Sequence, residues 1–294
     1  MLRIYGHVCE TDPYRTLTET GEVILFSKLG EAGLGPKLHG VFENGRLEEY
    51  IPSHTMTDSD LMNATVREHF ARKLARFHNF GTKLPLCKKP VDQFGVIQRK
   101  IEQFIDFKED FLENPKVINS LDGASKLASF GFLAELEWLR KSQPLIRSPL
   151  VFSTNDMNRL NCLIRDKPDQ FDEIVTLIDY EFSSTNYRGS DLGGHFGYWI
   201  MDFNQANFRS SLTMPSETIR REYAEAYLDE TRKISTRKLD DEIDSVEHIL
   251  LEAEFYGLSV MLLFLAWILE PEMNCIEHEN GEQFLVSYLL INQT

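Results

Sequence analysis

The chain has 294 residues, and its 31 Lys and Arg against 46 Asp and Glu give a formal net charge of −15. Hydrophobic residues make up 42% and charged residues 26%, which are globular proportions and exclude a chain that is disordered throughout. The acidity argues against a general nucleic-acid binder, because neutralising phosphates needs clustered Lys and Arg. The length fits one large domain or two lobes.

The four cysteines are scattered and form no C-x-x-C pair, which predicts reduced thiols rather than a disulfide framework or a zinc site. The first residues, MLRIYG, lack the basic and apolar regions of a secretory signal. The longest apolar stretch, residues 257–269, is too short to span a bilayer and predicts a buried helix. We therefore expect a cytoplasmic protein that does not span a membrane.

Residues 1–52 are predicted to form a small α+β unit. A strand over 2–5 precedes a helix over 22–31, and strands over 37–42 and 46–51 flank Asn44-Gly45, a strong hairpin signal. The remainder is predicted to be mostly helical. The expected helices begin at Asp58 or Asp60 and run through His78, and then cover 96–112, 124–142, 216–233, 238–269 and 282–291. The expected strands cover 149–152, 161–164 and 174–178.

The strongest chemical signal lies around the first two of these later strands. Asp156 is followed five positions later by Asn161, which is the spacing of a kinase catalytic loop. Asp179 follows the next apolar strand, where a kinase places a second magnesium-binding acid. Mg²⁺ prefers such hard oxygen ligands. Alternatively, residues 155–156 form a simple turn and Asp179 caps a strand, but the strand–turn–strand context favours the kinase interpretation.

The segment from Ile178 to Trp199 reads IDYEFSSTNYRGSDLGGHFGYW and closely resembles the signature of choline/ethanolamine kinases. The resemblance extends through GPKL, NGRLEEYIP and ARFH upstream and through the apolar helix ending near residue 267, so it covers nearly the whole chain. It implies an α+β, protein-kinase-like fold with a truncated N-lobe over 1–52 and a helical C-lobe over 53–294. The implied reaction moves the ATP γ-phosphate to the hydroxyl of choline or ethanolamine, with Mg²⁺, in phospholipid synthesis.

The resemblance also implies roles for individual residues near the phosphates. Asp156 would accept the proton of the alcohol, while Asn161 and Asp179 would hold Mg²⁺. Arg3 would contact the ATP phosphates, and Glu22 would steady Arg3; a surface salt bridge explains these two equally well.

Further positions take structural or nucleotide-binding roles on the same basis. Glu49 would lie in the segment that meets the adenine. Asp191 would brace the catalytic loop by accepting its backbone amides. His78 and His195 are interpreted as hydrogen-bonded core histidines, because phosphoryl transfer needs no His base.

A quaternary ammonium offers no N–H group, so aromatic faces must hold it. The resemblance places this pocket at five aromatic positions: Phe182, Tyr198, Phe203, Phe264 and Trp267. The periodicity of the apolar helix alone would explain the last two as core packing.

The chain departs from the family pattern at four positions. Thr154 stands in place of His, Tyr198 in place of Glu, Phe264 in place of Trp, and Glu49 adds a negative charge near the adenine. The family's glycine-containing strand–loop–strand is expected ahead of residues 2–5. Its absence and these changes support an alternative hypothesis, a catalytically weak or inactive pseudokinase with a binding or regulatory role. A protein or antibiotic kinase is disfavoured, and the resemblance also implies a homodimer.

Overall fold

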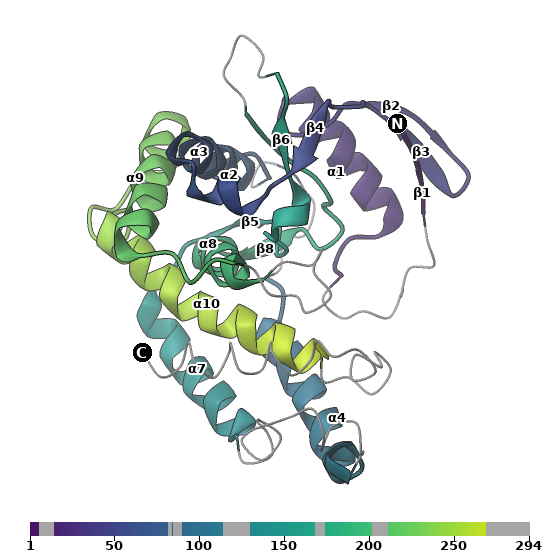
Figure 1. Ribbon diagram of the computed structural model, residues 1–294. Coiled ribbons are helices and arrows are strands. Elements are labelled where there is room, and N and C mark those ends of the chain that lie inside the picture. The colour runs from purple at the N-terminus through teal and green to yellow at the C-terminus, as the bar shows by residue number, and fades with distance from the viewer. Residues whose placement is uncertain are drawn as a thin grey trace.

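The computed structural model describes residues 1–5, 15–81, 84, 90–113, 130–167, 174–201 and 211–268. Small sheets lie toward the N-terminal part, and helices make up most of the rest (Figure 1). This arrangement confirms the predicted α+β class. The domain boundary at residue 52 stays a prediction.

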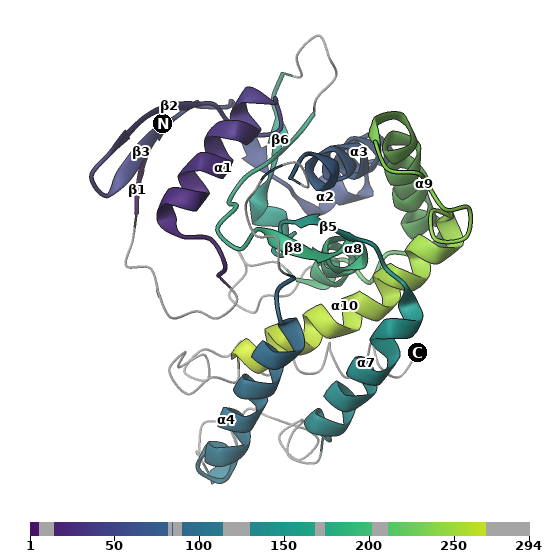
Figure 2. The same cartoon turned by 180° about the vertical axis from the view of Figure 1, so that it is seen from behind.

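The N-terminal sheet has three antiparallel strands in the order β1-β3-β2. These strands are β1 (Leu2–Ile4), β2 (Leu38–Phe42) and β3 (Gly45–Glu48), and the predicted hairpin is confirmed, with Asn44 at a positive φ of 63°. Helix α1 (Glu19–Glu31) precedes the hairpin, and the Thr18 hydroxyl caps it by accepting from the Gly21 amide. The helix packs beside β2, next to the sheet (Figure 2).

Two further strand groups position the predicted catalytic segments. Strand β5 (Leu150–Ser153) pairs with β8 (Ser184–Tyr187), while β6 (Cys162–Arg165) lies between β7 (Val175–Leu177) and β4 (Ser53–Thr55). At the ends of these ladders Ser153 pairs with Ser184 and Cys162 pairs with Leu177. The loop from β5 to β6 and the loop from β7 to β8 therefore leave the strands at neighbouring points.

The predicted single helix from Asp58 or Asp60 through His78 is wrong, because the structure breaks it into α2 (Asp58–Met62) and α3 (Ala64–Gly81). A reciprocal capping box between Thr57 and Asp60 begins α2. Asn63 then takes an extended conformation with ψ of 115°, which ends α2 before α3 starts. The capping box at Thr57 and Asp60 and the extended Asn63 therefore set helix ends that the continuous apolar pattern does not reveal.

The other helices are α4 (Gln93–Glu113), α7 (Phe132–Ile146), α9 (Glu217–Ile234) and α10 (Val246–Ile268), while the helix expected over 282–291 lies outside the described residues. They agree with the predicted ones except at two N-terminal ends, because α7 begins at Phe132 rather than at 124, and α10 begins at Val246 rather than at 238, after a turn over 241–245. Helix α10 crosses the molecule, with α4 and α7 along one side of it (Figures 1 and 2). By length and composition α10 could cross a bilayer, but 67% of its apolar window is buried inside the protein, as expected for a core helix.

Helix α8 (Arg188–Gly197) is buried along its whole length and was not predicted. It packs directly against α10, and Gly193 makes this close approach possible. A Cβ atom at Gly193 would lie 2.3 Å from the Ala253 carbonyl oxygen and 2.4 Å from the Gly257 nitrogen. The two helix backbones therefore touch, and any larger side chain at this position would push them apart.

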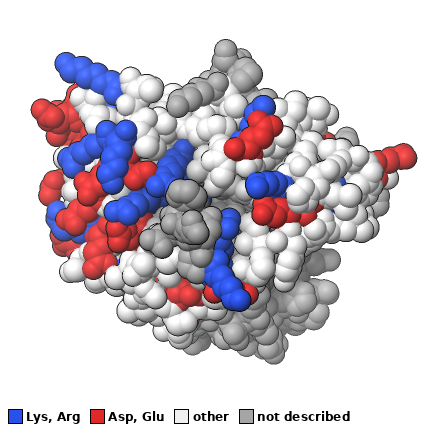
Figure 3. All heavy atoms as spheres, turned by 90° about the horizontal axis from the view of Figure 1, so that it is seen from above, with Lys and Arg blue, Asp and Glu red and all other residues white. Residues whose placement is uncertain are grey.

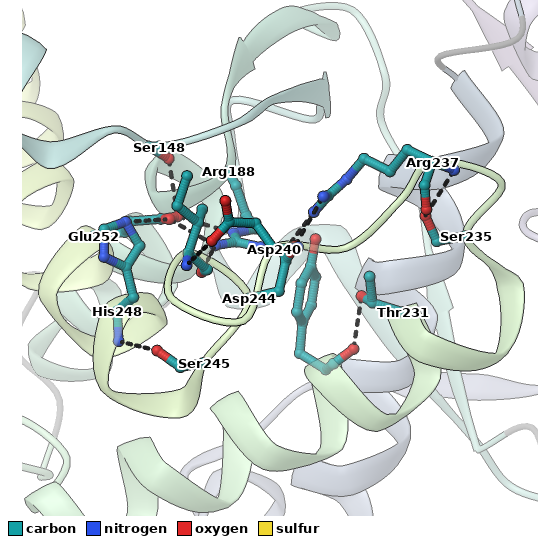
Figure 4. A network of polar contacts seen from close by, with 12 residues as sticks. Ser148, Arg188, Thr231, Ser235, Arg237, Asp240, Asp244, Ser245, His248 and Glu252 are labelled. Carbon is teal, nitrogen blue, oxygen red and sulfur yellow. Dashed lines mark hydrogen bonds and ion pairs between the residues drawn. The ribbon is translucent and has the colours of Figure 1, made fainter.

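The first residue of α8 carries a buried charge into this contact. Arg188 donates to both carboxylate oxygens of Glu252 at 2.9 and 2.6 Å, to Asp244 at 2.7 Å and to the Ile243 carbonyl at 2.8 Å. Arg237 also pairs with Asp244, and Ser148 donates to Glu252 at 2.8 Å (Figure 4). The network therefore joins α8, α10 and the 235–245 segment. Removing one partner would leave the other charges buried and unpaired, which would destabilise the fold.

Helix α9 packs on α3 through the buried residues Tyr223, Ala224, Tyr227 and Leu228, and ion pairs to neighbouring helices surround this contact. Arg67 of α3 pairs with Glu222, and Arg221 pairs with Glu247 of α10 at 2.9 Å. On the face seen in Figure 3, basic and acidic side chains lie next to one another. Exposed pairs of this kind contribute little to stability individually.

We expect Arg188→Ala to lower the free energy of unfolding by about 3–5 kcal/mol, because it leaves Glu252 and Asp244 buried without their cation. Urea denaturation measures the loss. Arg232→Ala serves as the control, since Arg232 forms an exposed pair with Asp229 at 3.3 Å. Equal stability of the two variants would show that the buried network contributes nothing specific.

The same network makes stability sensitive to acid. Burial alone would raise the pKa of Asp244, but hydrogen bonds from Arg237, the Asp240 amide and Arg188 lower that pKa to about 2. The unfolded chain therefore takes up this proton first, and the stabilisation is lost as pH falls from about 4 toward 2. We expect Asp244→Asn to flatten the decline of unfolding free energy over this range. A wild-type slope in the variant would contradict this account.

Candidate active site

Asp156 lies half-buried in the loop between β5 and β6, and two side-chain amide groups donate to its carboxylate. Asn158 Nδ2 donates to Oδ1 at 2.8 Å, and Asn161 Nδ2 donates to Oδ2 at 2.8 Å and to the Asp156 carbonyl at 3.0 Å. Burial raises the pKa of Asp156 to about 6, with the negative charges of Asp179 and Glu181 adding to the rise and the two amides opposing it. Asp156 is therefore a carboxylate suited to accepting a proton near neutral pH.

Asp179 lies beside this carboxylate, at the end of the β7 segment. The Ile178 amide donates to the Asn161 carbonyl at 3.0 Å, which ties the two loops together, and Asp179 takes a positive φ of 62°. Its carboxylate and the Asn161 amide oxygen supply hard ligands, as Mg²⁺ prefers. Among the described residues no group of three or more His, Cys, Asp or Glu is arranged to hold a metal ion. Asp179 and Asn161 together suit a cation such as Mg²⁺, which takes its remaining ligands from phosphates and water.

Arg3 reaches the site from β1, but not with the partner that the resemblance implies. Its Nη2 donates to Asp179 Oδ1 at 3.1 Å and Oδ2 at 3.2 Å. Glu22 instead accepts from Arg46 at 2.8 Å and from Arg15 at 3.1 Å, so the expected Arg3–Glu22 pair is wrong for this structure. The physical reason is that Arg46, which lies directly opposite Arg3 across β1 and β3, is the fully buried arginine of the two and takes Glu22 as its counter-charge.

Arg46 is a site-supporting residue that the sequence reasoning missed. Its guanidinium is fully buried, lies between Glu22 and Glu48, and stacks 4.1 Å from the centre of the Phe26 ring. One sequence pattern indicates this role: Arg46 and Glu48 stand two positions apart in the strand after Asn44-Gly45, so their side chains share one face of the strand. Arg46 fixes α1 against the N-terminal sheet from which Arg3 extends.

Glu49 follows β3, and its side chain folds back on the chain. Its Oε2 accepts from the Lys37 amide at 3.0 Å, and its own amide donates to the Lys37 carbonyl at 2.8 Å. The contact fixes the segment just before β4. The nucleotide role of Glu49 stays a prediction.

The predicted brace of the catalytic loop is present in the structure. Asp191, from the buried helix α8, accepts from the amides of Thr154 at 2.8 Å and Asn155 at 2.9 Å, and from the Thr154 hydroxyl at 3.0 Å. His78 Nε2 lies 3.0 Å from the same carboxylate. These contacts lower the pKa of Asp191 against the effect of burial, so its charge stays fixed beneath the loop.

Both histidines singled out from the sequence lie in the core, as predicted. His78 contacts Tyr227 Oη at 2.8 Å in addition to Asp191. His195 stacks on Phe70 at 4.0 Å between ring centres and contacts Tyr223 Oη at 3.0 Å. Burial lowers the pKa of His195 to about 3, so this ring stays neutral.

Asn155, directly before Asp156, is a second residue that the sequence reasoning did not assign. It takes a positive φ of 61°, which Asn tolerates better than most residues. Its Nδ2 donates to the Phe182 carbonyl and to Ser184 Oγ, each at 2.7 Å, and its Oδ1 accepts from Asn186 at 2.8 Å. One side chain therefore connects the catalytic loop to the segment that carries Phe182.

The predicted amine-binding residues are brought together in part. Tyr198 and Phe264 meet edge to face with ring centres 6.0 Å apart. Phe182 and Leu263 of α10 both pack against the buried pair Val91 and Val96. Phe203 lies outside the described residues, and of Trp267 the structure describes only its place in α10. Two of the five positions, Tyr198 and Phe264, are thus in direct contact near the end of α10, and Phe182 shares a small apolar cluster with the neighbouring Leu263.

Comparisons with known proteins identify the family. The family model for choline/ethanolamine kinase matches residues 1–287. A human choline/ethanolamine kinase is 31% identical over 282 residues, which cover 94% of this chain and 67% of the human protein. The chain belongs to the choline/ethanolamine kinase family. It is thus a member of a family of ATP-dependent phosphotransferases, and it spans about two thirds of the length of that relative.

Solved structures support the protein-kinase-like fold. A choline kinase from Cryptosporidium parvum superposes with a TM-score of 0.71 at 20% identity, covering 99% of this chain and 81% of that one. LicA in complex with AMP superposes with a TM-score of 0.58 at 16% identity, covering 92% of this chain and 76% of that one. The likeness confirms the predicted fold class.

We expect Asp191→Asn to reduce kcat by at least about 100-fold, because an amide nitrogen would face the donors of Thr154 and Asn155 and displace the loop. A coupled kinase assay measures the loss, and circular dichroism establishes that the variant is folded. Asp229→Asn, an exposed acid on α9, is the matched control. A kcat within twofold of wild type would contradict the bracing role.

Proposed function

We propose that this chain uses Mg²⁺ and ATP to phosphorylate the hydroxyl group of choline or ethanolamine. The observation that carries the proposal is the juxtaposition of Asp156, Asn161 and Asp179, joined by hydrogen bonds between two loops that leave neighbouring strand ends. Membership of the family supplies the reaction class.

Asp156 is the residue proposed to receive the alcohol proton. Its amide contacts fix both carboxylate oxygens, and its pKa of about 6 leaves the carboxylate largely ionised at neutral pH yet basic enough to accept a proton. Asp191 holds the loop backbone from below, so the carboxylate is positioned before the substrate arrives. Positioning of this kind is the main protein contribution to phosphoryl transfer.

Asp179 and Asn161 would hold Mg²⁺, which when bound neutralises charge on the transferring phosphates. Arg3 is proposed to contact the phosphates, since its guanidinium already lies at Asp179 and guanidinium groups bind phosphate oxygens well. LicA, which shares the fold, has been solved in complex with AMP, which supports nucleotide binding by this chain, and Glu49 is proposed to lie near the adenine.

Phe182, Tyr198 and Phe264 are proposed to form part of the wall that holds the amine. Aromatic faces attract a quaternary ammonium, and Phe182 is tied to the catalytic loop through Asn155. The base and the amine site are therefore linked by one side chain. The contribution of Phe203 and Trp267 stays a prediction.

The alternative is a pseudokinase that binds ligands without turnover. Thr154, in place of the family's His, was one reason for it, but Thr154 still donates to Asp191 through both its amide and its hydroxyl. The loop is therefore braced with Thr at this position. The test below separates the two functions.

We expect the purified chain to phosphorylate choline or ethanolamine with Mg·ATP, and Asp156→Asn to lower kcat by about 100- to 10,000-fold through loss of the proton acceptor. Product is measured as phosphocholine or phosphoethanolamine. Asp229→Asn is the control for a surface acid. No product from the wild type together with a melting temperature raised by Mg·ATP would favour the pseudokinase, and full activity in Asp156→Asn would refute the assigned role.

A further inference from the structure

A buried positive charge lies inside the catalytic loop, in a position that the reaction itself does not use. Arg159 opens the short helix η1 (Arg159–Asn161), between the proposed base Asp156 and the proposed metal ligand Asn161. Only 3% of its surface is exposed. A buried guanidinium needs a counter-charge and hydrogen-bond acceptors nearby, because its desolvation is otherwise costly.

Arg159 finds those partners on two elements far away in the sequence. Its Nη1 pairs with Asp58 at the start of α2, and its Nη2 donates to the Trp199 carbonyl at 3.1 Å. Asp58 in turn accepts from the amide and the hydroxyl of Ser211. The ion pair thus joins the catalytic loop, the first turn of α2 and the main chain next to Tyr198.

This place matters because the proposed substrate carries a positive charge. The Trp199 carbonyl lies one residue beyond Tyr198, whose ring meets Phe264 in the proposed amine wall. An uncompensated guanidinium bound to the main chain next to Tyr198 would repel a quaternary ammonium held at the proposed wall. Asp58 supplies the neutralising charge, and it is the part of the pair that reaches the surface, with 29% of its side chain exposed.

On the basis of the proposed function, we propose that the Arg159–Asp58 ion pair is a specificity-determining element of the amine pocket. Arg159 holds the Tyr198–Trp199 segment against the catalytic loop, and Asp58 cancels the charge that this positioning brings in. Arg159 can therefore hold this segment in place next to a pocket that accepts cations, because Asp58 balances its positive charge.

The test compares choline with 3,3-dimethylbutan-1-ol, an uncharged analogue in which carbon replaces the quaternary nitrogen. Both have similar shapes, so the ratio of their kcat/KM values isolates the effect of substrate charge. We expect Asp58→Asn to lower the choline-to-analogue ratio roughly tenfold, because it leaves Arg159 uncompensated. Arg159→Met should raise the same ratio, because it removes the positive charge of the pair and keeps the negative one, and the double variant Asp58→Asn/Arg159→Met should return it to the wild-type value.

Controls separate this electrostatic effect from a general loss of structure. Arg159→Lys keeps the charge and should keep the wild-type ratio, while Glu242→Gln removes an acid from an exposed pair with Arg147 and should leave it unchanged. Calorimetric dissociation constants for the two alcohols should show the same ratios without turnover. These outcomes would support the proposal even if kcat falls in every variant of the pair.

The failure of this proposal differs from the failure of the proposed function. A wild type that binds and phosphorylates choline, with a ratio that moves in neither single variant, would overturn the role of the ion pair alone. Ratios that fall in both single variants would also overturn it, since that pattern indicates a purely structural pair. A wild type that neither binds nor phosphorylates choline or ethanolamine would overturn the proposed function and this proposal together.

Discussion

The active-site geometry depends on two charges that α8 carries into the interior. The helix is buried along its length, so Arg188 and Asp191 must each be satisfied within the protein. Arg188 meets this requirement by binding Asp244 and Glu252, which fixes α8 to α10. Asp191 meets it by accepting the amides of Thr154 and Asn155, which fixes the catalytic loop to α8. The requirement to pair buried charges thus connects the helical core to the loop that carries Asp156.

Local signals predicted much of the fold, and tertiary contacts explain the errors. The hairpin at Asn44-Gly45 and the amphipathic α9 could be predicted because their signals lie within a few residues. Helix α8 was missed because its glycines and polar residues are weak helix formers, and packing against α10 stabilises it instead. The break at Asn63 was missed because the apolar pattern continues across it.

The candidate site shows the same division. Asp156, Asn161 and Asp179 could be predicted because their spacing is set by short strands and turns within one stretch of chain. The pairing of Arg3 with Asp179, rather than with Glu22, depends on the register of β1 against β3, which no local pattern reveals. Such contacts join residues that are far apart in the chain, so the sequence identifies the chemistry more readily than the pairing.

The backbone contact at Gly193 has a consequence for how this protein can change over time. Because main-chain atoms, not side chains, set the spacing of α8 and α10 at Gly193, smaller side chains elsewhere in the core cannot bring the two helices closer together at this point. The distance between these two helices is in this sense protected from changes in the side chains around them, and a substitution at Gly193 itself is the one that would alter it.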